Sequence, residues 1–189
     1  HIGEGAQTVD AGGGNDVIYS YSDGGEPDPA QGGDRINPAV PEGAADDVIA
    51  GGQGKDTFAF RLLLNATDEI LAKHTRDDGS INWRKVAGEN DNVHDHWVEG
   101  IGNDVLLDFS RQDKDKIVIR GHTVEVESIT HGADDGGAFS LITLRSQQGD
   151  GGGAHDEDAL GTLKVYGDKV TKDDIKLKAK VFYGVDDLE

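Results

Sequence analysis

The sequence predicts a mainly β protein built around a flattened coil of short parallel strands. Three observations favour this class. A glycine-rich segment recurs with a nine-residue pattern, each recurrence ends in an apolar strand, and the last third of the chain alternates apolar and polar residues. At 189 residues the chain is long enough to bury a core in one domain.

The repeat is clearest in "GGQGKDTFA", residues 51–59, where closely spaced glycines precede Asp56 and an aromatic residue. The pattern is G-G-x-G-x-D-x-U-x, with U a large apolar residue, and it recurs at residues 11–19, 42–50 and 99–107. Residues 2–10 fit the register but carry Gln7 in place of the Asp. Glycine permits the tight turn of the first six residues. The last three form a strand with an inward apolar residue, which is Ile18, Ile49, Phe58 or Leu106.

The alternative is a set of ordinary glycine turns between β-strands, capped by Asp. Four matches in a fixed order, two of them back to back, favour the repeat.

The composition restricts the function. There are 37 acidic and 18 basic residues, a formal charge of −19, which disfavours nucleic acid and anionic membranes as partners. The absence of Cys excludes disulfides and thiolate chemistry. No apolar run reaches the length of a membrane span, so membrane insertion is not expected, and the N-terminus does not form a signal peptide. The missing initiator Met and the closing Leu188-Glu189 indicate a fragment of a longer protein.

Carbonyl oxygens and Asp carboxylates are the ligands that Ca²⁺ prefers. With this motif the chain resembles the RTX (repeats-in-toxin) β-roll family of secreted haemolysins, proteases, lipases and mannuronan epimerases. The segment "VLLDFSRQDKDKIVI", residues 105–119, is similar to the segment that closes such rolls. The resemblance implies a right-handed parallel β-roll that holds several Ca²⁺ ions between stacked turns, in a secreted, extracellular protein exported by type I machinery.

The resemblance also implies the ligands, position by position. The implied side-chain ligands are Asp16, Asp47, Asp56, Asp104, Asp108, Asp113 and Asp115. The implied carbonyl positions are Gly12, Gly14, Gly43, Ala45, Gly52, Gly54, Gly100 and Gly102. Because Gln7 lacks a charge, a site that involves the first unit is expected to be weak or absent.

The predicted coil spans residues 1–120, with two interruptions. Residues 20–41 hold all four prolines and are expected to form an irregular loop. Some RTX modules cut themselves at Asp-Pro, but a plain turn is the favoured interpretation of Asp28-Pro29. Residues 61–98 are expected to contain two short helices, the first capped by Asn65 or Thr67 and the second by Ser80.

Two aromatic residues and a histidine pair stand out in the second interruption. Trp83 and Trp97 are expected to anchor the helices, and the alternative is a sugar-stacking platform. His94 and His96 would need a third ligand for Zn²⁺, from Asp95, His122 or His155. The favoured interpretation is a polar loop, because no HExxH spacing accompanies the pair.

Residues 121–189 are expected to form antiparallel strands packed on the end of the roll, since alternation with glycine breaks is typical of such strands. The glycine and acid loop at residues 147–158 is either a mobile acidic loop or a further Ca²⁺ site. The latter would use Asp150, Asp156 and Asp158.

No catalytic motif is present: there is no G-x-S-x-G elbow, phosphate loop or HExxH. We therefore expect a non-catalytic module for calcium-dependent folding and secretion. Its expected partners are calcium ions, other domains of a larger parent protein and the type I secretion machinery. The alternative is a calcium-dependent module that binds a polysaccharide or another surface.

Overall fold

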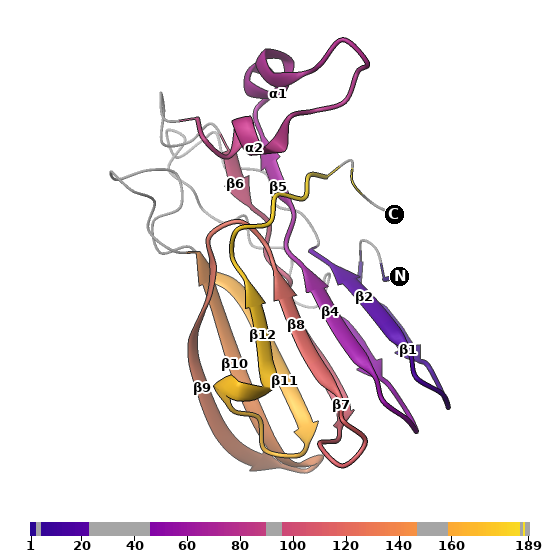
Figure 1. Cartoon of the computed structure of the whole chain (residues 1–189). Coiled ribbons are helices and arrows are strands. Elements are labelled where there is room, and N and C mark those ends of the chain that lie inside the picture. The colour runs from indigo at the N-terminus through magenta and orange to yellow at the C-terminus, as the bar shows by residue number, and fades with distance from the viewer. Residues whose placement is uncertain (3–4, 23–45, 90–95, 147–158, 186, 188–189) are drawn as a thin grey trace.

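The computed structural model describes residues 1–2, 5–22, 46–89, 96–146, 159–185 and 187. Most of the ordered elements are strands, which form two main sheets stacked face to face (Figure 1). The six-stranded sheet has the order β1 (Thr8–Asp10), β3 (Val48–Ala50), β7 (Asn103–Phe109), β11 (Ala159–Gly167), β10 (Gly137–Ser146) and β9 (Val124–Asp134). The four-stranded sheet has the order β12 (Ile175–Lys178), β8 (Lys116–Arg120), β4 (Thr57–Arg61) and β2 (Val17–Tyr21). The predicted mainly β class is confirmed.

The chain passes repeatedly from one sheet to the other. Strands β1, β3, β7 and β11 lie in the six-stranded sheet and alternate along the sequence with β2, β4, β8 and β12 of the other sheet. Every pair formed within either of these two sets is parallel. The parallel arrangement predicted for residues 1–120 is therefore present, and it continues to β12.

The C-terminal region corrects one expectation. The hairpin β9–β10 and the pair β10–β11 are antiparallel, as predicted. However, β11 also pairs in parallel with β7, and β12 pairs in parallel with β8. Residues 121–189 are thus not wholly an antiparallel extension. Alternating hydropathy reports that one face of a strand is buried, and it carries no information about strand direction.

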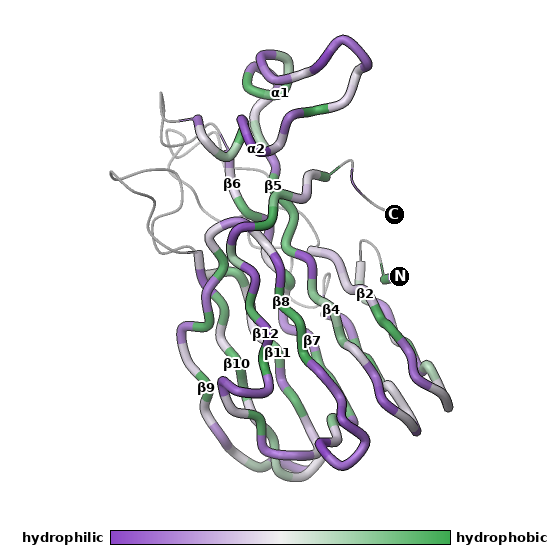
Figure 2. Tube along the Cα trace, in the orientation of Figure 1, coloured by the Kyte–Doolittle hydropathy of each residue, from purple (hydrophilic) through white to green (hydrophobic). Residues whose placement is uncertain are grey.

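The core lies between the two sheets. The apolar residue of each complete repeat is buried, with exposed fractions from 0 to 6% for Ile18, Ile49, Phe58 and Leu106. Apolar and polar residues alternate along the strands in Figure 2, while the turns at the lower end are mainly hydrophilic. Burial of alternate apolar side chains is what holds the two sheets together.

The second interruption forms a small subdomain beyond the ends of the sheets (Figure 1). It contains α1 (Asp68–His74), α2 (Trp83–Val86) and the antiparallel pair β5 (Leu64–Ala66) and β6 (His96–Val98). Thr67 precedes α1 as predicted, but α2 begins after Asn82 and not after Ser80. No helix in the described ranges is long and apolar enough to cross a membrane.

Candidate calcium-binding turns

The two ends of the sheets differ in their connections. At one end, which we call the turn edge, residues 11–16, 51–56, 110–115 and 168–174 join the six-stranded sheet to the four-stranded sheet. We call these the first to fourth turns. At the opposite end, the loop edge, the return connections comprise residues 22–47, 62–102 and 121–158.

The first and second turns share one backbone conformation and lie directly against each other. Gly12 and Gly52 have φ angles of 85° and 86°, and Gly14 and Gly54 have φ angles of 137° and 130°. The N–H of Gln53 donates to Gly12 O at 2.8 Å. A Cβ atom would lie 1.7 Å from Gly12 O if added at Gly52, and 1.6 Å from Gly14 O if added at Gly54. These turns therefore require glycine both for its conformation and for the close approach.

Three aspartates form a column along the turn edge. Asp16, Asp56 and Asp115 each directly precede a strand of the four-stranded sheet, and the register of those strands places them side by side. Asp56 Oδ1 accepts the N–H of Asp16 at 2.8 Å, and Asp115 Oδ1 accepts the N–H of Asp56 at 2.8 Å. Asp56 and Asp115 thus each join their own turn to the preceding one. The predicted ligands Asp16 and Asp56 are brought together.

The Oδ2 atoms of Asp16 and Asp56 do not take part in these contacts between turns. Within the part of the chain that the structure describes, both Oδ2 atoms are buried without a hydrogen-bond partner. A Cβ added at Gly51 would lie 2.5 Å from Asp56 Oδ2, so this oxygen lies over the start of its own turn. A buried carboxylate oxygen without a donor is costly unless a positive charge meets it.

A second column lies at the loop edge and contains the predicted ligands Asp47 and Asp104. Asp47 Oδ1 accepts the N–H of Gln7 at 2.9 Å, and Asp104 Oδ1 accepts the N–H of Asp47 at 2.9 Å. Both aspartates are buried, at about 1% exposure. Gln7 thus occupies the place of an aspartate at the outer end of this column, as the sequence register indicates. The columns also give the pairing of repeats, which stacks units two apart.

Glycine also allows two backbone segments to approach closely at the loop edge. Gly102 has a φ angle of 69°, and its carbonyl accepts the N–H of Thr162 at 2.9 Å. A Cβ at Gly161 would lie 2.1 Å from Gly102 O. Gly100 is buried next to this turn. Gly161 lies near the start of β11, and the nine-residue pattern does not reveal this close approach, because no Asp follows Gly161 at the pattern position.

The carboxylates of the closing segment are engaged with donors of the protein. Asp108 accepts the N–H groups of Gly51 and Gly52 at 2.9 and 2.7 Å. Asp115 Oδ2 accepts the N–H of Ser110 at 2.9 Å, and Asp113 Oδ2 accepts the Ser110 hydroxyl at 2.8 Å. These aspartates stabilise the second and third turns directly. Their role as metal ligands stays a prediction.

Burial and like charges shift two of these carboxyl groups. Desolvation by burial raises the pKa of Asp47, and the charge of Asp46 adds to the shift. Desolvation likewise raises the pKa of Asp115, together with the charges of Asp56 and Asp108. Both shifts disfavour the ionised form, and a divalent cation near either group would favour it.

The remaining predicted positions either lie outside the described residues or are buried in packing positions. Gly43, Ala45, His94, Asp95, Asp28-Pro29, Asp150, His155, Asp156 and Asp158 lie outside the described residues. Trp83 and Trp97 are buried, at 6% and 8% exposure, and Trp83 belongs to the core cluster. The structure therefore gives the two indoles a packing position and not the open ring faces of a sugar platform.

Sequence reasoning missed contacts that depend on which loops stack. Asp46 Oδ1 accepts the N–H of Asn103 at 2.9 Å, and Asn15 Oδ1 accepts the N–H of Lys55 at 2.9 Å. Asp46 and Asn15 each directly precede the Asp of the nine-residue pattern, which is Asp47 in residues 42–50 and Asp16 in residues 11–19. The sequence signal for these contacts was a carboxylate or amide side chain directly before the Asp of the pattern.

In the described residues no group of three or more His, Asp or Glu side chains is placed to hold a metal ion. Sites in the turns would instead combine backbone carbonyls with one or two carboxylates. The sequence matches no family model, and no curated protein or solved structure is significantly similar to the chain.

Proposed function

We propose that this chain is a calcium-binding module whose folding depends on calcium, and that it belongs to a larger extracellular protein of the RTX type. We also propose that its strands form a β-roll, with calcium between stacked turns. The supporting observation is the pair of identical glycine turns that end in Asp16 and Asp56, each with a buried Oδ2 atom lacking a donor.

The residues present fit a calcium ion in two respects. Gly52 and Gly54 of the second turn leave no space for a side chain, because the carbonyl oxygens of Gly12 and Gly14 lie directly against them. The carboxylates of Asp16 and Asp56 add anionic oxygens at the same edge, and hard oxygen ligands of this kind suit Ca²⁺. Asp47 and Asp104 would serve in the same way at the loop edge. The ion would supply the positive charge that these carboxylate and carbonyl oxygens coordinate.

Charge explains why the chain would need the ion. A formal charge of −19 and two columns of buried or half-buried aspartates oppose the compact state. Extracellular calcium modules typically bind at about 10⁻⁴ to 10⁻³ M. A ligand present at 100 times its Kd stabilises the folded state by about 2.7 kcal/mol per independent site. A few such sites would supply much of the stability of about 5–15 kcal/mol that a domain has.

This switch suits export. At the low calcium of the cytosol the calcium-dependent strands and turns would stay loose, which suits that part of the chain to passage through a type I channel, and they would fold once outside. We propose no catalytic role for the module. The alternative of carbohydrate binding depended on Trp83 and Trp97, and their burial removes the observation that favoured it.

Asp56→Asn tests the proposal at one atom. Asn keeps the acceptor for the N–H of Asp16 but replaces the buried Oδ2 with a donor. We expect at least a tenfold loss in apparent calcium affinity, measured by a circular dichroism titration from chelated protein. Asp77→Asn removes the same charge at an exposed position and should leave the titration unchanged. A chelated wild-type protein with a fully native spectrum would rule out the folding switch, and equal titrations for the two variants would rule out the turn site.

A further inference from the structure

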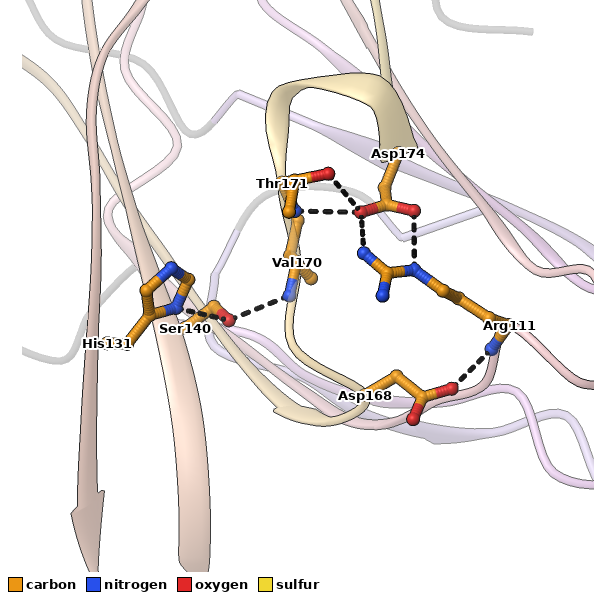
Figure 3. Close-up of polar contacts among 7 residues, drawn as sticks. All are labelled: Arg111, His131, Ser140, Asp168, Val170, Thr171 and Asp174. Carbon is orange, nitrogen blue, oxygen red and sulfur yellow. Dashed lines mark hydrogen bonds and ion pairs between the residues drawn. The ribbon is translucent and has the colours of Figure 1, made fainter.

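The turn edge changes its chemistry between the third and fourth turns. The position four residues before the closing aspartate is a glycine in the first two turns, Gly12 and Gly52. In the third turn the same position is Arg111. The side chain of Arg111 extends toward the fourth turn, residues 168–174, as Figure 3 shows. The third turn therefore carries a guanidinium group at the position where the first two turns have a glycine without a side chain.

Arg111 makes three hydrogen bonds to the fourth turn (Figure 3). Its backbone N–H donates to Asp168 Oδ2 at 2.7 Å. Its guanidinium binds Asp174 in the bidentate manner, with Nε to Oδ1 at 2.9 Å and Nη2 to Oδ2 at 2.5 Å. Bidentate pairs of this kind are the strongest and most directional ion pairs in proteins.

Asp174 is held in place before it meets the guanidinium. Its Oδ2 atom accepts the N–H of Thr171 at 2.7 Å and the Thr171 hydroxyl at 2.9 Å, which forms a capping box on the short helix Lys172–Asp174. The hydrogen bond from Arg111 lowers the pKa of Asp174 to about 2. The carboxylate is therefore ionised and paired throughout the physiological pH range.

The fourth turn is also held from the side of the antiparallel hairpin. The hydroxyl of Ser140 in β10 accepts the N–H of Val170 at 2.9 Å, and it lies 3.1 Å from Nδ1 of His131 in β9 (Figure 3). Ser140 is buried, at 1% exposure. The fourth turn is thus joined both to the third turn and to the antiparallel hairpin, and each of these contacts is made between groups of the protein.

We propose that Arg111 supplies, between the third and fourth turns, the positive charge that calcium supplies between the first and second. This inference rests on the proposed function and specifies which part of it needs the metal. The last step of the turn stack closes without an ion, so strands β8 to β12 form a calcium-independent part of the module. Calcium dependence is confined to β1 to β4, their turns and the contact of Asp104 in β7 with Asp47.

Hydrogen exchange of the whole chain, read by mass spectrometry on its peptides, tests this division. In chelator we expect protected amides in peptides from residues 116–146 and 159–178, and fast exchange in peptides from residues 5–22 and 46–61. Added calcium should protect the second group. Arg111→Gln should lower protection of residues 168–178 in chelator at least tenfold. Arg84→Gln is the matched control, because Arg84 is exposed on α2.

Asp174→Asn provides a second, independent variant. It removes the other half of the ion pair and should cause the same loss as Arg111→Gln, while the double variant should lose no more than either single one. Additive losses, or an Arg111→Gln pattern equal to that of Arg84→Gln, would overturn the inference.

The two proposals fail in different ways. If chelator unfolds every segment of the wild type together, the division is wrong and the calcium switch stands. If calcium changes exchange nowhere, the switch is wrong, and the comparison of Arg111→Gln with Arg84→Gln in chelator still decides the role of Arg111.

Discussion

At the scale of single residues, the turn glycines and the carboxylates carry different parts of the structure. The glycines decide how closely two turns approach, and the carboxylates tie one turn to the next through backbone N–H groups. The nine-residue spacing predicted both sets, because turn conformation and inward burial are local properties. It did not predict which oxygens accept donors from the protein, since Asp108 and Asp115 meet partners more than fifty residues away in the sequence.

Gly54→Ala tests the close approach of the turns. The new Cβ would meet Gly14 O at 1.6 Å and would force alanine to a φ angle of 130°. The conformational cost alone is about 1–2 kcal/mol, so we expect a loss of at least about 2 kcal/mol in the free energy of unfolding. That corresponds to roughly 4–8 °C in melting temperature for a chain of this size. Gly13→Ala meets no atom within 4 Å and should cost less than about 0.5 kcal/mol.

His122 provides a prediction on acid stability. Burial lowers the pKa of His122 from 6.5 to about 4, and its ring lies against Phe182 at 5.2 Å between centroids. The unfolded chain therefore binds this proton first as the pH falls, and stability declines from about pH 6.5 toward pH 4. The contribution to the slope is at most about 1.4 kcal/mol per pH unit. Urea unfolding in saturating calcium should show a shallower decline for His122→Gln, and an unchanged slope would contradict the shift.

At the scale of elements, strand direction and pairing come from the connections. The periodic pattern located β2, β3, β4 and β7 as short strands with buried apolar residues. It did not give the partners, because residues 22–47 and 62–102 separate them, nor did it show that β11 and β12 return to the parallel sheets. A connection long enough to contain the hairpin β9–β10 made these strands look like a separate antiparallel unit.

Gln7→Asp tests the aspartate column at the loop edge. The substitution places a third carboxylate beside Asp47 and Asp104, so we expect a lower melting temperature in chelator and a higher one in calcium than the wild type. Thr130→Asp adds the same charge at an exposed position of β9, away from both columns, as a control. Thermal unfolding in the two buffers measures both effects. A melting temperature that falls equally in both buffers would argue against a cation at this column.

At the scale of the whole molecule, the excess negative charge destabilises the compact state through self-repulsion. Sodium chloride shortens the Debye length from about 10 Å at 0.1 M to about 3 Å at 1 M. In chelator, higher salt should therefore raise the melting temperature by screening repulsion among the acidic groups. In saturating calcium the rise should be smaller, because the ions already offset part of that charge. Differential scanning calorimetry at the two salt concentrations makes the comparison, and equal responses would contradict it.

The two ends of the sheets accept sequence change very differently. The first three turns have six residues each and the fourth has seven, whereas the return connections hold a helical subdomain and a long hairpin. Lengthening a connection at the loop edge leaves the strand register intact, while one extra residue in a stacked turn would displace a whole column of carboxylates. Foreign peptides or reporter domains are therefore best inserted near Asp77 and Gly79. These residues lie in the exposed bend between α1 and α2, within a connection that already contains a helical subdomain.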